Sequence, residues 1–121
     1  QRKSAWRELE KQYLPHKNYE GCDFLERGGW WFQQSHIFGS PFYYIDYTLA
    51  QICALQFWKR MYDNREEAWN DYVRLCEVGG TKSFLGLVEY ANLKSPFEDG
   101  CVSSIITDIK AWLDAVEDQQ L

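Results

Sequence analysis

Apolar residues recur at helical intervals in most segments of this sequence, and no segment alternates apolar and polar residues convincingly with a period of two. This pattern predicts an all-α fold, an irregular bundle of about six helices. With 121 residues, of which 45% are hydrophobic, the chain is long enough to bury a core. We therefore expect residues 1–121 to form a single helical unit.

Capping and turn residues divide the sequence into helical segments. The pattern predicts helices over 4–13, 23–38 (interrupted at Gly28-Gly29), 41–62, 66–78, 84–91 and 102–117. Ser40-Pro41 is a strong helix start, because a capping hydroxyl precedes a proline in the first helical position. The helix that it opens is apolar nearly all round, which indicates a central, buried element. On the next helix, the expected buried edge is Trp69, Tyr72, Val73 and Cys76.

Charge and cysteine usage exclude several classes of protein. The chain has 13 Lys and Arg against 18 Asp and Glu, which argues against a basic face for nucleic acid. Its apolar runs are far too short for a membrane span. The four cysteines form no CxxC pair, and residues 1–10 lack the apolar core of a signal peptide. We expect a cytoplasmic protein that binds neither nucleic acid nor membranes.

The segment from His36 to Tyr47 holds the most chemically capable side chains. It places one imidazole before a Gly39-Ser40-Pro41 turn and three phenols after it. If the turn folds back, His36, Tyr44 and Tyr47 could converge, since the two tyrosines share one face of the predicted helix. Such hydrogen-bond donors suit an oxygen that gains negative charge in a transition state. The helical spacing on its own favours the other interpretation, burial in a core.

No complete catalytic constellation accompanies these residues. The sequence has no HExxH, no phosphate-binding GxxxxGK[ST] loop, no GxSxG and no Cys/His cluster with metal spacing.

The run HIFGSPFYYIDYTLAQICALQFW, residues 36–58, closely resembles the C-terminal part of the oligoendopeptidase F and Pz-peptidase group. This group belongs to the thimet-oligopeptidase-like zinc metallopeptidases. Other segments of the group also occur in the expected order: Tyr13-Leu14-Pro15, Phe24-Leu25, Gly28-Gly29-Trp30, Gly79-Gly80 and Ser95-Pro96-Phe97. The resemblance implies a helical, zincin-type peptidase that cleaves oligopeptides inside a deep channel.

The resemblance also implies roles for single residues. His36 matches the histidine on the carbonyl side of the substrate, and Tyr44 and Tyr47 match tyrosines that bind substrate and stabilise the oxyanion. Tyr43 is either a substrate contact or a packing residue. The glycines at 28, 29 and 39 resemble places where the backbone lies close to the peptide, and helix packing remains open as the other reason for Gly28-Gly29.

In this family the zinc ligands are two histidines of HExxH and a glutamate on a following helix, all N-terminal to the part that resembles this chain. The resemblance therefore implies a C-terminal fragment of a zinc-dependent oligoendopeptidase, which hydrolyses internal bonds of short peptides. The fragment alone is expected to be inactive and to bind no Zn²⁺. Its implied partners are an oligopeptide substrate and the N-terminal part of the same enzyme, and its apolar surface could drive self-association. The alternative is a free-standing helical interaction module without catalysis.

Overall fold

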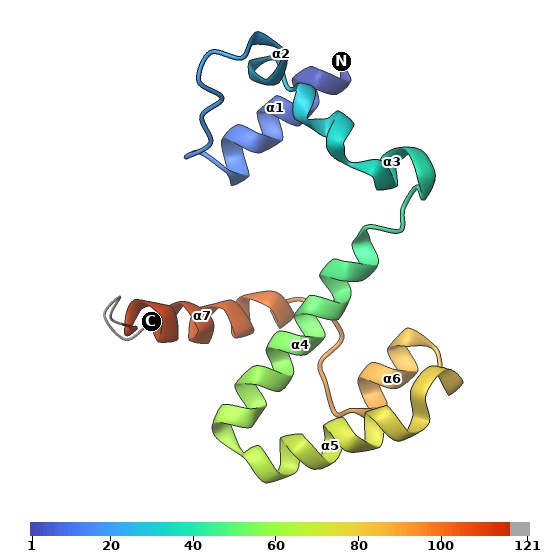
Figure 1. Cartoon of the computed structure of the whole chain (residues 1–121). Helices are drawn as coiled ribbons and strands as arrows, with labels where there is room; N and C mark the ends of the chain where they lie inside the picture. The colour runs from blue at the N-terminus through green and yellow to red at the C-terminus, as the bar shows by residue number, and fades with distance from the viewer. Residues whose placement is uncertain (117–121) are drawn as a thin grey trace. The chain divides into compact units, whose positions relative to one another are not determined.

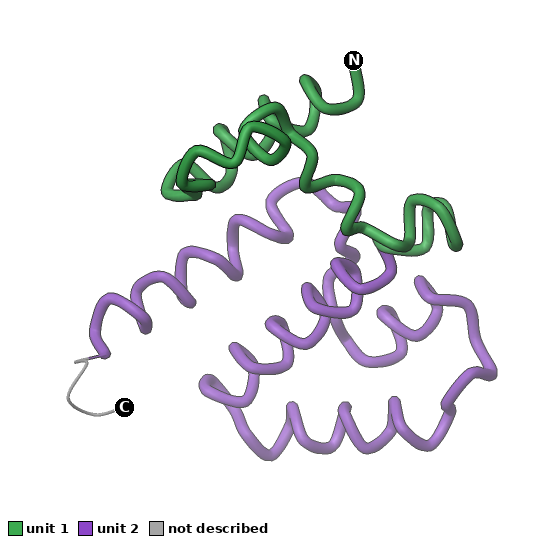
Figure 2. Tube along the Cα trace, turned by 45° about the horizontal axis from the view of Figure 1, so that its top comes forward, with its two compact units in different colours: residues 1–44 green, residues 45–121 purple. Residues whose placement is uncertain are grey.

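The structure is a computed structural model that describes residues 1–116 (Figure 1). In this range it contains seven α-helices, two short 3-10 helices and no strand, which confirms the predicted all-α class. Its contacts divide the chain into two compact units, Gln1–Tyr44 and Ile45–Leu121, coloured separately in Figure 2.

The first unit consists of four short elements: α1 (Arg2–Tyr13), α2 (Asp23–Glu26), the 3-10 helix η1 (Gly29–Gln33) and α3 (Ser35–Gly39). One interrupted helix was expected over residues 23–38, but Gly28 has a φ of 86° and ends the first piece in the left-handed region. A side chain at Gly28 would overlap the backbone of Lys3 on α1, and one at Gly29 would overlap the Phe24 ring. The paired glycines therefore allow η1 to pack closely against α1 and α2.

The second unit contains α4 (Ile45–Asp63), α5 (Arg65–Val78), the 3-10 helix η2 (Gly79–Thr81), α6 (Phe84–Tyr90) and α7 (Cys101–Asp114). Local capping sets several of these boundaries. The side chain of Asn64 accepts a hydrogen bond from the Glu67 amide, and Ser83 does the same for Gly86. Gly79, with a φ of 44°, ends α5 as expected. The predicted last residue of the final helix, Glu117, lies outside the described residues.

The start of the long helix α4 differs from the prediction. Residues 41–44 form turns rather than helix, and α4 begins at Ile45. Phe42 has a φ of 68°, a backbone conformation that L residues other than Asn and Asp rarely adopt and that cannot continue a right-handed helix. Burial is also less than expected, because only Gln56 and Phe57 of α4 are fully buried.

The core of the second unit is small and lies between α4, α5 and α6. Its buried members are Phe57, Val88, Ala91 and Leu93, with Cys53 and Leu75 packed against them. Helix α7 contacts α4 through an ion pair between Lys59 and Asp108 and through the Trp58 and Trp112 rings, whose centroids are 5.7 Å apart.

The buried edge predicted for α5 is wrong. Trp69, Tyr72, Val73 and Cys76 are exposed, whereas Ala68 and Asp71 are buried. Asp71 can be buried because its carboxylate accepts hydrogen bonds from Arg60, Arg74 and Asn92. These partners allow a carboxylate to occupy a position that an apolar pattern assigns to hydrophobic residues.

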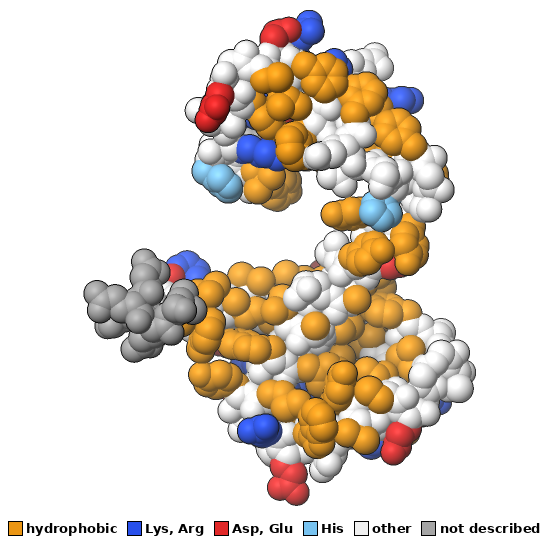
Figure 3. Space-filling model, viewed as in Figure 1, with side chains coloured by type: hydrophobic (Ala, Val, Ile, Leu, Met, Phe, Trp, Pro, Cys, Tyr) orange, Lys and Arg blue, Asp and Glu red, His pale blue; other side chains and the backbone are white. Residues whose placement is uncertain are grey.

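Large hydrophobic side chains remain exposed in both units, and Figure 3 shows them spread over the visible face. No helix in the described range is long and apolar enough to cross a membrane. All four cysteines are free: Cys101 is buried, Cys53 is half-buried, and Cys22 and Cys76 are exposed. Burial raises the pKa of the Cys53 and Cys101 thiols.

Candidate active site

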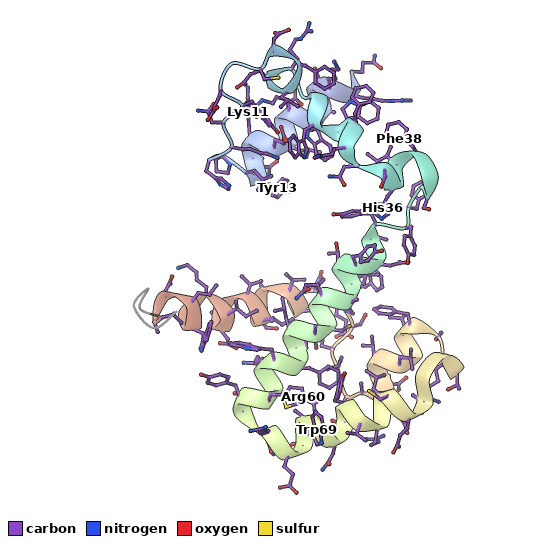
Figure 4. All side chains as sticks on the ribbon, viewed as in Figure 1. Lys11, Tyr13, His36, Phe38, Arg60 and Trp69 are labelled. Carbon is purple, nitrogen blue, oxygen red and sulfur yellow. The ribbon has the colours of Figure 1, made fainter. Side chains whose placement is uncertain are left out.

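Helix α3 and the turn that follows it bring His36 next to two tyrosines. His36, which projects from α3 in Figure 4, has its carbonyl hydrogen-bonded to the Ser40 amide at 3.0 Å. The His36 and Tyr44 ring centroids are 4.8 Å apart and meet edge-on at 79°. The Tyr43 ring lies at 6.2 Å and is stacked at 26°. The turn thus folds back and brings His36 next to Tyr44, while the roles of both residues remain predictions.

Tyr47 lies in the first turn of α4, which belongs to the second unit. The expectation that Tyr44 and Tyr47 share one helix face is wrong, because Tyr44 precedes the helix. Tyr47 is 55% exposed. Its convergence with His36 remains a prediction.

His36 and Tyr44 line a cavity of about 460 Å³ within the first unit. Other apolar parts of its wall come from three places: Trp6 on α1, Leu14 just after α1 and Trp30 on η1. Ile37, next to His36 on α3, adds a further apolar side chain. A cavity of this size, with mainly apolar surface and several polar groups in its wall, is typical of small-molecule pockets.

A buried carboxylate, Glu10, forms part of the same cavity wall and is only 4% exposed. It accepts a hydrogen bond from the Tyr19 hydroxyl, and the Lys17 ammonium lies 3.7 Å from its Oε1. Arg7 Nη1 lies 3.5 Å from Oε2. The indole N–H of Trp6 approaches the carboxylate without reaching hydrogen-bond geometry.

These neighbours determine the charge of the pair formed by Glu10 and Tyr19. Burial by itself raises the pKa of Glu10, but the hydrogen bond from Tyr19 and the charges of Lys17 and Arg7 outweigh it, so the pKa lies below its usual value. Burial and the bond to Glu10 raise the pKa of Tyr19 to about 12. Glu10 is therefore ionised and Tyr19 neutral at physiological pH.

The helical pattern and the motifs of the sequence do not single out Glu10, Lys17 or Tyr19. A signal existed for Glu10, because it lies four residues after Trp6 and therefore on the same face of α1 as an apolar residue. Tyr19 gave no signal, since it lies in a loop without periodicity.

The three glycines that were predicted to contact the substrate differ in how closely the chain packs around them. Packing within the first unit already accounts for Gly28 and Gly29. Gly39 is the last residue of α3, and a side chain there would meet no atom within 4 Å. Contact of any of them with a substrate remains untested.

The described residues do not fit the zinc ion that the family resemblance implies. Between residues 1 and 116, no three His, Cys, Asp or Glu side chains are grouped so that they could hold a metal ion. We therefore assign no reaction step to a metal on these residues.

No family model matches the sequence, and no curated protein does. Solved structures do match it. Pz peptidase A with an inhibitor is 62% identical over 97% of this chain, with a TM-score of 0.87. A structure of oligoendopeptidase F is 57% identical over 98% of the chain, with a TM-score of 0.88. The chain belongs to the oligoendopeptidase F and Pz-peptidase group.

A further oligoendopeptidase F of this group, from Bacillus anthracis, is 54% identical over 98% of the chain, with a TM-score of 0.65. The chain spans only 21% of the length of each of these three proteins. The sequence resemblance to the group is thus confirmed, for a part of such a protein.

Proposed function

We propose that this chain is the C-terminal part of an oligoendopeptidase and forms the side of the cleft that binds the substrate carbonyl. The observation that carries the proposal is the edge-on approach of Tyr44 to His36 on a cavity wall, in a chain of the oligoendopeptidase F group. The intact enzyme hydrolyses internal bonds of short peptides. The match to peptidase chains favours this function over a free-standing interaction module.

The chemistry assigned to these residues is the stabilisation of negative charge. When water adds to a peptide carbonyl, the carbonyl oxygen becomes an oxyanion, which an imidazole N–H and phenolic O–H groups can hold by hydrogen bonds. His36 and Tyr44 supply two such donors from one unit, and Tyr47 supplies a third from the start of α4. Tyr43, which stacks on His36, contacts the substrate beside them.

The substrate backbone passes closest to the chain at Gly39 in this proposal. A glycine there leaves open space, because a side chain would meet no neighbouring atom. The same contact at Gly28 and Gly29 is supported only by resemblance, because packing already explains these glycines.

The zinc ligands belong, in this proposal, to the N-terminal part of the same cytoplasmic enzyme. The coverage of 21% leaves ample length for such a part. Exposed hydrophobic residues such as Phe38 and Phe42 form the interface with it. Without that part, the chain cleaves no peptide, binds no zinc and associates with itself.

The decisive experiment replaces Tyr47 by Phe in the intact enzyme. Loss of one oxyanion donor lowers kcat by about 10²–10³, while the zinc content measured by elemental analysis stays the same. Tyr13→Phe is the matched control, since Tyr13 lies at the exposed end of α1. Unaltered turnover in Tyr47→Phe would refute the role given to this residue.

The chain alone offers a second test. Elemental analysis and a peptide-cleavage assay of the purified 121-residue chain should give no stoichiometric zinc and no cleavage. One tightly held zinc per chain would contradict the assignment of the ligands to another part. Light scattering over a range of concentrations should show association, and a monomer throughout would argue against the proposed interface.

A further inference from the structure

The cavity beside His36 has the walls of a side-chain pocket. Its volume of about 460 Å³ lies within one unit, so its shape is defined by neighbouring elements of this chain. Two indoles, Trp6 from α1 and Trp30 from η1, provide flat apolar surfaces, and Leu14 and Ile37 provide aliphatic ones. Such walls favour a bulky apolar group over water.

The charged groups in the wall neutralise each other. The Lys17 ammonium lies 3.7 Å from the Glu10 carboxylate and 3.9 Å from the centroid of the Trp30 ring. A cationic ligand would bind over the Trp30 indole and next to the Glu10 carboxylate, but Lys17 already occupies this position. An anion meets a lysine whose charge is already compensated. A charged ligand would lose its hydration here without gaining a free partner of opposite charge.

The position of the cavity connects it to the reaction. His36 and Tyr44, the proposed donors to the substrate carbonyl, line the same space as the indoles. A peptide whose scissile carbonyl lies against His36 therefore brings a neighbouring side chain within reach of Trp6 and Trp30.

We propose that this cavity is a specificity pocket for a bulky, uncharged side chain next to the scissile bond, as in Leu or Phe. The inference deepens the proposed function and rests on it for the identity of the ligand as a peptide. Each methylene in a hydrophobic pocket changes selectivity by about tenfold or more. Leu and Phe are therefore preferred over Ala by at least about tenfold, and over Asp and Lys by more.

The test measures binding to the ¹⁵N-labelled 121-residue chain by NMR. The probes are the N-acetyl amides of Phe, Leu, Ala, Asp and Lys. The Phe and Leu amides should shift the indole N–H signals of Trp6 and Trp30 at concentrations about tenfold lower than the others. Trp69, an exposed indole in the second unit, is an internal control and should not respond. Equal responses to the Phe and Asp amides, or none to the Phe amide, would overturn the proposal.

Matched variants locate the binding. Leu14→Arg places a long cationic side chain on the cavity wall and should abolish the shifts. Leu9→Arg makes the same change on an exposed face of α1 that does not line the cavity, and should preserve them. Loss of the shifts in both variants, or in neither, would contradict the assignment.

The same comparison in the intact enzyme keeps the inference testable if the isolated chain does not fold. There, Leu14→Arg should reduce the ratio of kcat/KM for Phe-containing over Asp-containing peptides by about tenfold. An active enzyme with an unchanged ratio would refute the pocket and leave the peptidase function standing. If the unaltered intact enzyme cleaved no peptide, that result would overturn the proposed function and, with it, the identification of the ligand as a peptide.

Discussion

The side-chain amide of Asn92 donates hydrogen bonds to both carboxylate oxygens of Asp71, at 3.0 and 3.1 Å, across 21 residues of sequence. Arg60 adds a bond to the same carboxylate at 2.5 Å and another to the Ala91 carbonyl at 2.9 Å. Asp71 therefore joins α4, α5 and the segment after α6 through one buried group. The architecture of the second unit depends on this polar centre as well as on its small apolar core.

Replacing Asp71 by Ala should lower the free energy of unfolding by about 3 kcal/mol, because the partly buried Arg60 and the Asn92 amide lose their shared acceptor. Urea denaturation followed by circular dichroism measures this. Asp63→Ala serves as the control, since its ion pair with Lys59 is exposed, and it should change stability by less than about 0.5 kcal/mol. Equal losses in the two variants would contradict the central role of Asp71.

The contribution of Asp71 should depend on pH. Hydrogen bonds from Arg60 and Asn92 hold the pKa of this carboxyl below its usual value. Because the pKa of Asp71 is lower in the folded than in the unfolded chain, its ionised carboxylate stabilises the fold fully at a pH above the unfolded-state pKa of about 4. This stabilisation is lost as the pH falls through the folded-state pKa. The difference in melting temperature between wild type and Asp71→Asn should therefore shrink on acidification below about pH 4. A difference that stayed constant would exclude this linkage.

The pair of Tyr19 and Glu10 predicts the opposite pH dependence in the first unit. The pKa of Tyr19 is raised to about 12 in the folded chain, so its neutral hydroxyl stabilises the fold fully below about pH 10, the usual pKa of a tyrosine. This stabilisation disappears as the pH rises through about 12. Tyr19→Phe should remove a phenol that titrates near pH 12 from an ultraviolet absorbance titration. It should also lower stability by about 1–2 kcal/mol, because Glu10 loses a buried donor. Tyr13→Phe, at a residue that is 70% exposed, is the control and should leave the stability unchanged.

Gly28→Ala should destabilise the chain by more than about 2 kcal/mol, because the residue has a positive φ and its Cβ would overlap Lys3. Thermal denaturation measures the loss. Gly80→Ala is the matched substitution, at a glycine with negative φ and open surroundings, and should stay within about 0.5 kcal/mol. Similar melting temperatures for the two variants would rule out the packing explanation for Gly28.

Gly39→Ala separates stability from substrate contact. A methyl group at this position meets no atom of the chain, so the melting temperature should not fall. In the intact enzyme the same methyl group should raise KM by about tenfold, because it occupies space proposed for the peptide backbone. An unchanged KM would exclude Gly39 as a substrate contact.

Local signals in the sequence were sufficient for part of the fold. The start of α6 depends on the Ser83 side chain, which caps the Gly86 amide three residues on, so a short-range pattern predicts it. Helix α5 begins at Arg65, one residue before its predicted start, because Asn64 caps the Glu67 amide in the same way. The start of α4 does not follow from such a pattern, because Phe42 adopts a left-handed conformation that its residue type disfavours. The buried face of α5 was missed because Asp71 is buried by partners from two other segments.

In the candidate site, too, the local sequence predicts one feature, whereas another depends on contacts between distant segments. The proximity of His36 to Tyr44 follows from a short turn, which the Gly39-Ser40-Pro41 sequence predicts. The cavity that they line also needs Trp6, Lys17 and Trp30, which meet only after α1 and η1 have packed together. Periodicity within one helix contains no information about such an arrangement.

The distribution of the thiols gives the protein a natural pair of labelling positions. At neutral pH the raised pKa of Cys53 and Cys101 keeps these two protonated and slow to react. Cys22 and Cys76 are exposed, and they fall one in each compact unit. A maleimide dye or spin label applied to the unaltered sequence would therefore report the separation of the two units directly, with or without a bound peptide.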